Sequence, residues 1–237
     1  VIGGLEKKSK IISPEEKKIV AYHEAGHAIT GWFLKYADPL VKVSIVPRGI
    51  AALGYAQYLP KEQYLYQTEQ LLDDMCMALG GRAAEELVFG KISTGALSDL
   101  ERITKMAYSM VTMYGMNNVI GNISFFDSKK TEYSFTKPYS DSTAEKIDYE
   151  VKRIVEKAYQ RTINLLKEKK DKLEIIAKEL LRKEILFQSD IEKLIGKRPF
   201  KTPDIKLGKE NIDKVDENNS LNKENEINER NNDLSEK

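Results

Sequence analysis

The sequence has little cysteine, little net charge and no long apolar run. Cys76 is the only cysteine in 237 residues, so no internal disulfide can form, and a reducing or organellar compartment is expected. No apolar stretch approaches the roughly 18–20 residues needed to cross a bilayer, so the chain itself is expected to be soluble. The net charge of +1 gives no field that would attract nucleic acid, and no nucleic-acid partner is expected.

The beginning of the chain also lacks familiar signals. It starts at Val1 rather than methionine and shows no signal-peptide pattern. We therefore expect a fragment of a longer protein.

Helical patterns dominate the remaining sequence, and we predict a mainly α fold. Ser13, Pro14 and Glu16 match a capping box, which predicts a helix from there to about residue 36. Ser142 and Glu145 match a second one. The further predicted helices cover about residues 68–88, from the loop at 93–95 to about 114, about 142–169, 171–183 and 189–195.

Two extended segments break the helical pattern. Residues 41–45 alternate with period two, and a second extended piece follows around residues 54–59, after a turn at 47–49. They predict a small antiparallel β-ribbon. A further short strand is possible at 122–126. Within the second helix, Gly80 and Gly81 indicate close backbone packing.

The composition changes after Phe200. Residues 211–237 are rich in Asn, Lys and Glu and contain no aromatic residue. Such a segment buries too little apolar area to offset the entropy of ordering, so we predict that residues 201–237 form a disordered tail. The folded domain is expected to cover residues 12–200.

The sequence His23-Glu24-Ala25-Gly26-His27 has the spacing H-E-x-x-H within the first predicted helix. Residues i and i+4 of a helix project from one face, so two imidazoles can reach one Zn²⁺ at about 2.0–2.1 Å. Glu24 can then take a proton from metal-activated water. His23 and His27 are also the only histidines, which disfavours the alternative of an exposed helix with incidental histidines.

A third zinc ligand is expected, because catalytic zinc sites usually combine three protein ligands with one open position. Asp99 stands where a loop becomes a helix, and Glu85 and Glu86 lie on the preceding helix. Spacing alone does not choose between them. Asp99 could instead complement its helix dipole, and the glutamates could form a solvated face. Cys76 is more typical of a core thiol.

Several motifs follow one another in a specific order and spacing. They are His23–His27, Pro47-Arg48-Gly49, Ala52-Leu53-Gly54-Tyr55, Gly80-Gly81-Arg82-Ala83-Ala84-Glu85-Glu86 and Ser93-Thr94-Gly95-Ala96-Leu97-Ser98-Asp99. Together they resemble, over roughly residues 12–200, the peptidase domain of the FtsH family of membrane-anchored, ATP-dependent AAA proteases. Residues 54–66 and 197–200 look especially like the mitochondrial m-AAA (AFG3-like) branch.

The resemblance implies a zinc metalloendopeptidase domain with metal ligands His23, His27 and Asp99 and catalytic Glu24. Glu85 would orient a ligating imidazole. It also implies unfolded or membrane polypeptides as substrates and a hexameric ring in the parent protein.

The chain lacks the G-x-x-x-x-G-K-[ST] loop that binds ATP phosphates. We therefore expect residues 1–11 to be the linker from an ATPase module, the user of ATP, and expect an N-terminal membrane anchor in the parent. The mitochondrial inner membrane is the expected location, with a plastid-type membrane as the alternative. A rival function is a non-catalytic assembly domain that oligomerises through helices between residues 140 and 195.

Overall fold

The computed structural model describes residues 13–47, 53–59, 63–126 and 138–200. The chain divides into two units, residues 1–200 and 201–237, and the fold below is that of the first. The expected linker at 1–11, part of the turn at 47–49 and the expected disordered tail lie outside the described residues.

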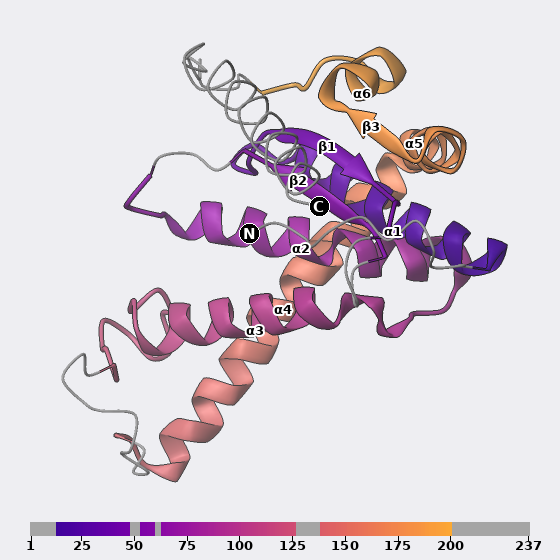
Figure 1. Ribbon diagram of the computed structural model, residues 1–237. Helices are drawn as coiled ribbons and strands as arrows, with labels where there is room; N and C mark the ends of the chain where they lie inside the picture. The colour runs from indigo at the N-terminus through magenta and orange to yellow at the C-terminus, as the bar shows by residue number, and fades with distance from the viewer. Residues whose placement is uncertain (1–12, 48–52, 60–62, 127–137, 201–237) are drawn as a thin grey trace, which may run out of the picture. The chain divides into compact units, whose positions relative to one another are not determined.

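The first unit is mainly helical, as predicted. The helices of the described residues are α1 (Pro14–Phe33), α2 (Thr68–Phe89), the 3-10 helix η1 (Thr94–Ala96), α3 (Leu97–Thr112), α4 (Asp141–Glu168), α5 (Lys170–Lys183) and α6 (Gln188–Ile195). A small sheet packs against α1, α5 and α6, while α3 and the first half of α4 extend away from that sheet (Figure 1). No helix in the described part of the chain is both long and apolar enough to cross a membrane.

Helix α1 begins as predicted and ends early. The Ser13 hydroxyl accepts a hydrogen bond from the Glu16 backbone N–H at 3.2 Å, and the Glu16 carboxylate accepts one from Ser13 N–H at 3.2 Å. The predicted end near residue 36 is wrong, because the chain becomes extended at Leu34. Arg198 donates to the carbonyls of Leu34 and Ala37 at 2.8 and 2.9 Å, and so satisfies acceptors just beyond the helix.

Helix α4 begins two residues earlier than the pattern around Ser142 predicted. Ser140 is the N-cap, and its hydroxyl accepts a hydrogen bond from the Thr143 backbone N–H at 3.3 Å. Both serines are suitable caps by residue type, and the structure uses the earlier one.

The predicted ribbon is confirmed as part of a three-stranded antiparallel sheet. β1 (Leu40–Ser44) lies between β2 (Tyr55–Tyr58) and β3 (Ile185–Phe187), so β2 is an edge strand among the residues that the structure describes. The sequence did not predict β3, which pairs Val43 with Leu186. The possible strand at 122–126 is wrong, because these residues have no regular secondary structure.

Helices α1 and α2 pack very close together in the core. Apolar residues of α1, the sheet and α5 form one buried cluster, and those of α2, α3 and α4 form another. Where α1 meets α2, a Cβ added at Gly26 would lie 2.2 Å from the Gly80 carbonyl oxygen. The two helices therefore meet through backbone atoms, as Gly80 and Gly81 indicated in the sequence.

Candidate active site

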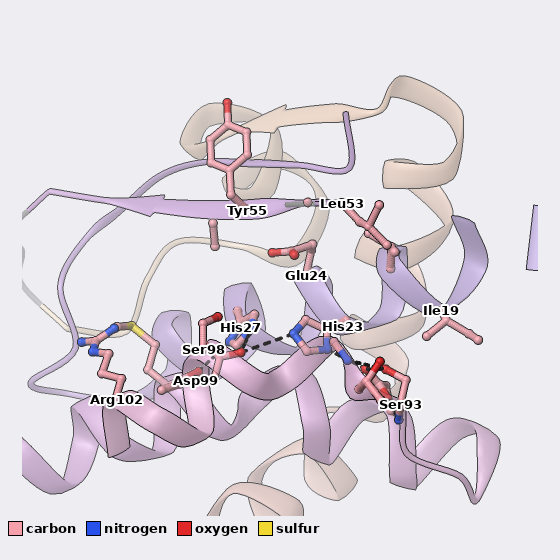
Figure 2. A pocket seen from close by; sticks show the side chains of 18 of the residues that line it. Ile19, His23, Glu24, His27, Leu53, Tyr55, Ser93, Ser98, Asp99 and Arg102 are labelled. Carbon is pink, nitrogen blue, oxygen red and sulfur yellow. Dashed lines mark hydrogen bonds and ion pairs between the residues drawn. The ribbon is translucent and has the colours of Figure 1, made fainter. Parts of the chain in front are cut away.

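His23 and His27 project from one face of α1 toward the start of α3. Both are buried, and their ring centroids are 4.7 Å apart. The Asp99 Oδ2 atom lies 3.6 Å from His23 Nε2 and 3.5 Å from His27 Nε2 (Figure 2). One ligand atom from each of these three residues lies within 4.8 Å of the others.

The spacing of these three atoms fits a tetrahedral metal site. Ligand distances of about 2.1 Å from a zinc ion correspond to tetrahedral edges of about 3.4 Å. The two measured separations from Asp99 are close to that edge and longer than ordinary hydrogen bonds. Two imidazoles and one carboxylate are also a typical donor set for zinc, with a fourth position left for water or substrate.

The second nitrogen of each imidazole has its own partner. His23 Nδ1 lies 2.6 Å from Glu85 Oε1, and His27 Nδ1 lies 2.8 Å from the Met77 carbonyl oxygen. A carbonyl oxygen only accepts, so His27 Nδ1 donates and its Nε2 is left with a lone pair when the ring is neutral. These contacts orient both Nε2 atoms toward Asp99.

Glu85 is itself held in place by the loop before η1. The backbone N–H of Ser93 donates to Glu85 Oε2 at 2.6 Å, and the Ser93 hydroxyl lies 3.0 Å from Oε1. These hydrogen bonds fix the carboxylate that contacts His23. Glu85 therefore contacts the His23 ring and is not one of the three residues whose ligand atoms converge.

The other candidate third ligands lie elsewhere. Glu86 accepts a hydrogen bond from the Tyr159 hydroxyl, and the buried Cys76 thiol lies 3.5 Å from the Ala158 carbonyl oxygen. The described residues that could hold a metal ion together are His23, His27 and Asp99.

Opposite charges dominate the electrostatics of the cluster. Burial lowers the pKa of His23, but the nearby carboxylates of Asp99 and Glu85 outweigh burial and raise the pKa to about 10. Burial raises the pKa of Asp99, but the two histidines hold it well below its usual range. A protonated imidazole therefore occupies this site in the absence of metal, and a bound cation would replace that proton.

Glu24 lies beside the cluster with an unsatisfied oxygen. Its side chain is buried, and Oε2 has no hydrogen-bond partner within the described residues. Burial raises the pKa of this carboxyl group. A buried carboxylate with a raised pKa is suited to accept a proton from a reacting group.

Two glycines make room for these side chains. A Cβ added at Gly81 would lie 2.3 Å from His23 Nε2, and one added at Gly54 would lie 2.7 Å from Glu24 Oε1. The sequence predicted close packing at Gly81 but gave no indication of its contact with His23. It missed the contact of Gly54 with Glu24, for which a glycine at the start of a strand was the only signal.

The cluster opens into a cavity of about 550 Å³. Figure 2 shows Glu24 beneath the strand that carries Tyr55, which is β2. The Tyr58 hydroxyl, at the other end of β2, donates to the His27 carbonyl oxygen at 2.9 Å. β2 is thereby attached to the helix that carries both histidines.

Comparison with known proteins agrees with this geometry. The family model described as Peptidase family M41 matches residues 10–194. The chain is 62% identical over 202 residues to the ATP-dependent zinc metalloprotease FtsH of Rhodothermus marinus, covering 84% of this chain and 29% of that protein.

Mitochondrial relatives match nearly as well. Identity is 57% over 200 residues with the mitochondrial inner membrane m-AAA protease component AFG3L2 of Mus musculus, covering 84% of this chain and 25% of that protein. It is 55% over 201 residues with the corresponding component YTA10 of Saccharomyces cerevisiae, covering 85% of this chain and 26% of that protein. The chain thus spans less than a third of the length of these relatives. It belongs to peptidase family M41 and carries the peptidase domain of the FtsH-type zinc metalloproteases.

Proposed function

We propose that residues 12–200 are the zinc-dependent endopeptidase domain of an ATP-dependent, membrane-anchored protease. The observation that carries the proposal is the convergence of two imidazole nitrogens and the Asp99 carboxylate beside the unpartnered oxygen of Glu24. A structural zinc site would close its fourth position with protein. The described metal-binding group contains three residues, which leaves a position for reacting water.

In this proposal His23 Nε2, His27 Nε2 and Asp99 would hold the zinc ion. The bound ion would supply Lewis acidity, which makes the attacking water more acidic and polarises the peptide carbonyl. Glu24 accepts the proton of the attacking water at its buried carboxylate and delivers it to the leaving amine. Glu85 keeps the His23 ring in the orientation that binding requires, through the contact with Nδ1.

The polypeptide substrate is proposed to bind along β2. This strand pairs with β1 on one side and forms the edge of the sheet on the other. An extended peptide can add to such an edge through backbone hydrogen bonds, which makes little demand on its sequence. That mode suits the degradation of unfolded polypeptides.

The parent protein is proposed to contain further parts. Residues 1–11 would connect to an ATPase module, which uses ATP. The parent would assemble as a hexameric ring and be anchored in a membrane. The names of the relatives support this proposal, since they include an ATP-dependent bacterial protease and components of mitochondrial inner-membrane proteases. We propose the mitochondrial inner membrane as the location, with a plastid-type membrane as the alternative.

The proposed function is tested by measuring metal content and proteolysis on the same sample. The 237-residue chain is expected to bind one zinc ion and to cleave casein, an unfolded substrate that needs no ATP-driven unfolding. A zinc chelator should stop cleavage, and added zinc should restore it. A chain that holds zinc and shows no cleavage would instead support the non-catalytic assembly domain.

A further inference from the structure

The cavity carries opposite charges at its two ends. Glu16, in the first turn of α1, lines one end, near Ile19. Arg102 of α3 also lines the cavity and follows Asp99 by three residues, so the two project from the same side of the helix. Figure 2 shows Arg102 on the far side of Asp99 from His23, whereas Ile19 and Ser93 lie at the opposite end.

Arg102 is an exposed cation without a partner in the described structure. Its side chain forms no hydrogen bond or ion pair with the described residues, and among the described residues that line the cavity it is the only arginine or lysine. One turn further along α3, Lys105 lies outside the cavity and forms an ion pair with Glu101 at 2.6 Å. The guanidinium of Arg102 is therefore available to a ligand that enters the cavity.

Arg102 also lies within electrostatic reach of the end of β2. Burial raises the pKa of the Tyr58 hydroxyl, and the positive charge of Arg102 opposes that rise. Gly54, at the start of this segment, lies against Glu24. Figure 2 shows the chain passing from Leu53 to Tyr55 toward the side on which Arg102 lies, so β2 runs from the proposed proton acceptor toward Arg102.

We propose that Arg102 determines specificity by binding an acidic side chain of the substrate, on the N-terminal side of the cleaved bond. This inference rests on the proposed peptidase function. Antiparallel addition to β2 is the slightly more stable pairing, and it makes the substrate run from Arg102 toward the histidines. Residues that precede the cleaved bond then pass Arg102. A guanidinium offers two parallel N–H donors to a carboxylate, so an Asp or Glu is the complementary side chain.

Glu16 strengthens the expected discrimination. An acidic side chain placed beyond the cleaved bond, toward Ile19, would approach the Glu16 carboxylate instead of Arg102. The two ends therefore favour opposite charges, and the same acidic residue should help on one side of the cleaved bond and not on the other.

The test uses the zinc-loaded 237-residue chain and a set of fluorogenic peptides with one common cleavage site. At each of four positions before and four after that site, peptides carry Asp, Asn or Lys. We expect Asp to raise kcat/KM by about two- to fivefold over Asn at one position before the site, mainly through KM, as for a partly exposed ion pair. Arg102→Gln should abolish this preference, and Arg102→Glu should transfer it to Lys. Lys105→Gln is the matched control and should keep it.

Four outcomes would overturn the inference while leaving the peptidase function intact. These are equal cleavage of Asp and Asn peptides, a preference that survives Arg102→Gln, a preference located only after the cleaved bond, and an equal fall in kcat for all peptides in Arg102→Gln. The last outcome would assign Arg102 to the chemical step. Failure of the zinc-loaded chain to cleave any peptide would overturn the proposed function itself. Circular dichroism and zinc content of the Arg102 variants show whether fold and metal site are retained.

Discussion

Glu85 Oε1 lies 2.6 Å from His23 Nδ1, and this contact turns the other ring nitrogen of His23 toward Asp99. The imidazole is thus held between two carboxylates, one on each nitrogen. The two carboxylates suit different tasks. Glu85 is held by Ser93 and orients the His23 ring, whereas Asp99 faces both histidines and can share a metal ion with them.

Glu24→Gln should keep zinc and lose proteolysis. Glutamine has nearly the same shape but cannot accept the proton of the attacking water. We expect a fall in kcat of about 10²- to 10⁴-fold on casein or a peptide. Glu15→Gln, an exposed position on the same helix, is the control for charge. Turnover equal to that of the unsubstituted chain would refute the role of Glu24.

Asp99→Ala should remove a metal ligand, whereas Glu85→Ala should remove only the carboxylate that orients the His23 ring. We expect Asp99→Ala to be purified with little zinc. Glu85→Ala should bind zinc about 10- to 100-fold more weakly, in line with the loss of a group that orients a ligating imidazole. Glu86→Ala is the matched control, because Glu86 contacts Tyr159 instead of the cluster.

Metal analysis and competition with a chromogenic chelator measure these effects. If Asp99→Ala kept stoichiometric zinc and Glu85→Ala lost it, the two carboxylates would have to exchange roles.

Zinc binding should release a proton. Without metal the pKa of His23 is raised to about 10, so its ring is protonated near neutral pH, whereas a metal ligand must be neutral. Zinc affinity should therefore rise as the pH rises toward 10 and fall in acid. Titration calorimetry in buffers of different ionisation enthalpy counts the released protons. Binding heats that are independent of the buffer would contradict this prediction.

Gly81→Ala should damage the metal site more than the fold. The added carbon would lie 2.3 Å from His23 Nε2, so the imidazole must leave its position. We expect loss of zinc and of activity, measured together with the thermal unfolding midpoint. Gly90→Ala is the control, because its added carbon meets no atom within 4 Å. It costs only left-handed backbone strain of about 1–2 kcal/mol and should retain zinc.

Local patterns predicted the helices well and their ends less well. The start of α1 is specified locally, by the neighbouring residues Ser13, Pro14 and Glu16. The end of α1 depends on Arg198, which is distant in sequence, and no local pattern reports that contact. β3 could not be predicted from the sequence either. A strand of three residues is too short to show an alternating pattern, and it forms by pairing with the distant β1.

The same distinction applies to the site. His23, Glu24 and His27 share one helix, so their spacing alone predicts that they act together. Asp99 and Glu85 both approach the histidines, and only the packing of α2 and α3 on α1 decides which nitrogen each one meets. Spacing could not choose between them, and the family resemblance supplied the preference for Asp99.

The backbone contact between Gly26 and Gly80 has a consequence for how the metal ion arrives. Main-chain atoms have no alternative rotamers, so α1 and α2 have no room to move closer together at this point when an ion binds. We therefore expect metal uptake without closure of the two helices on the ion. The rate of uptake should then depend on the loss of protons from the ligands and on access through the cavity.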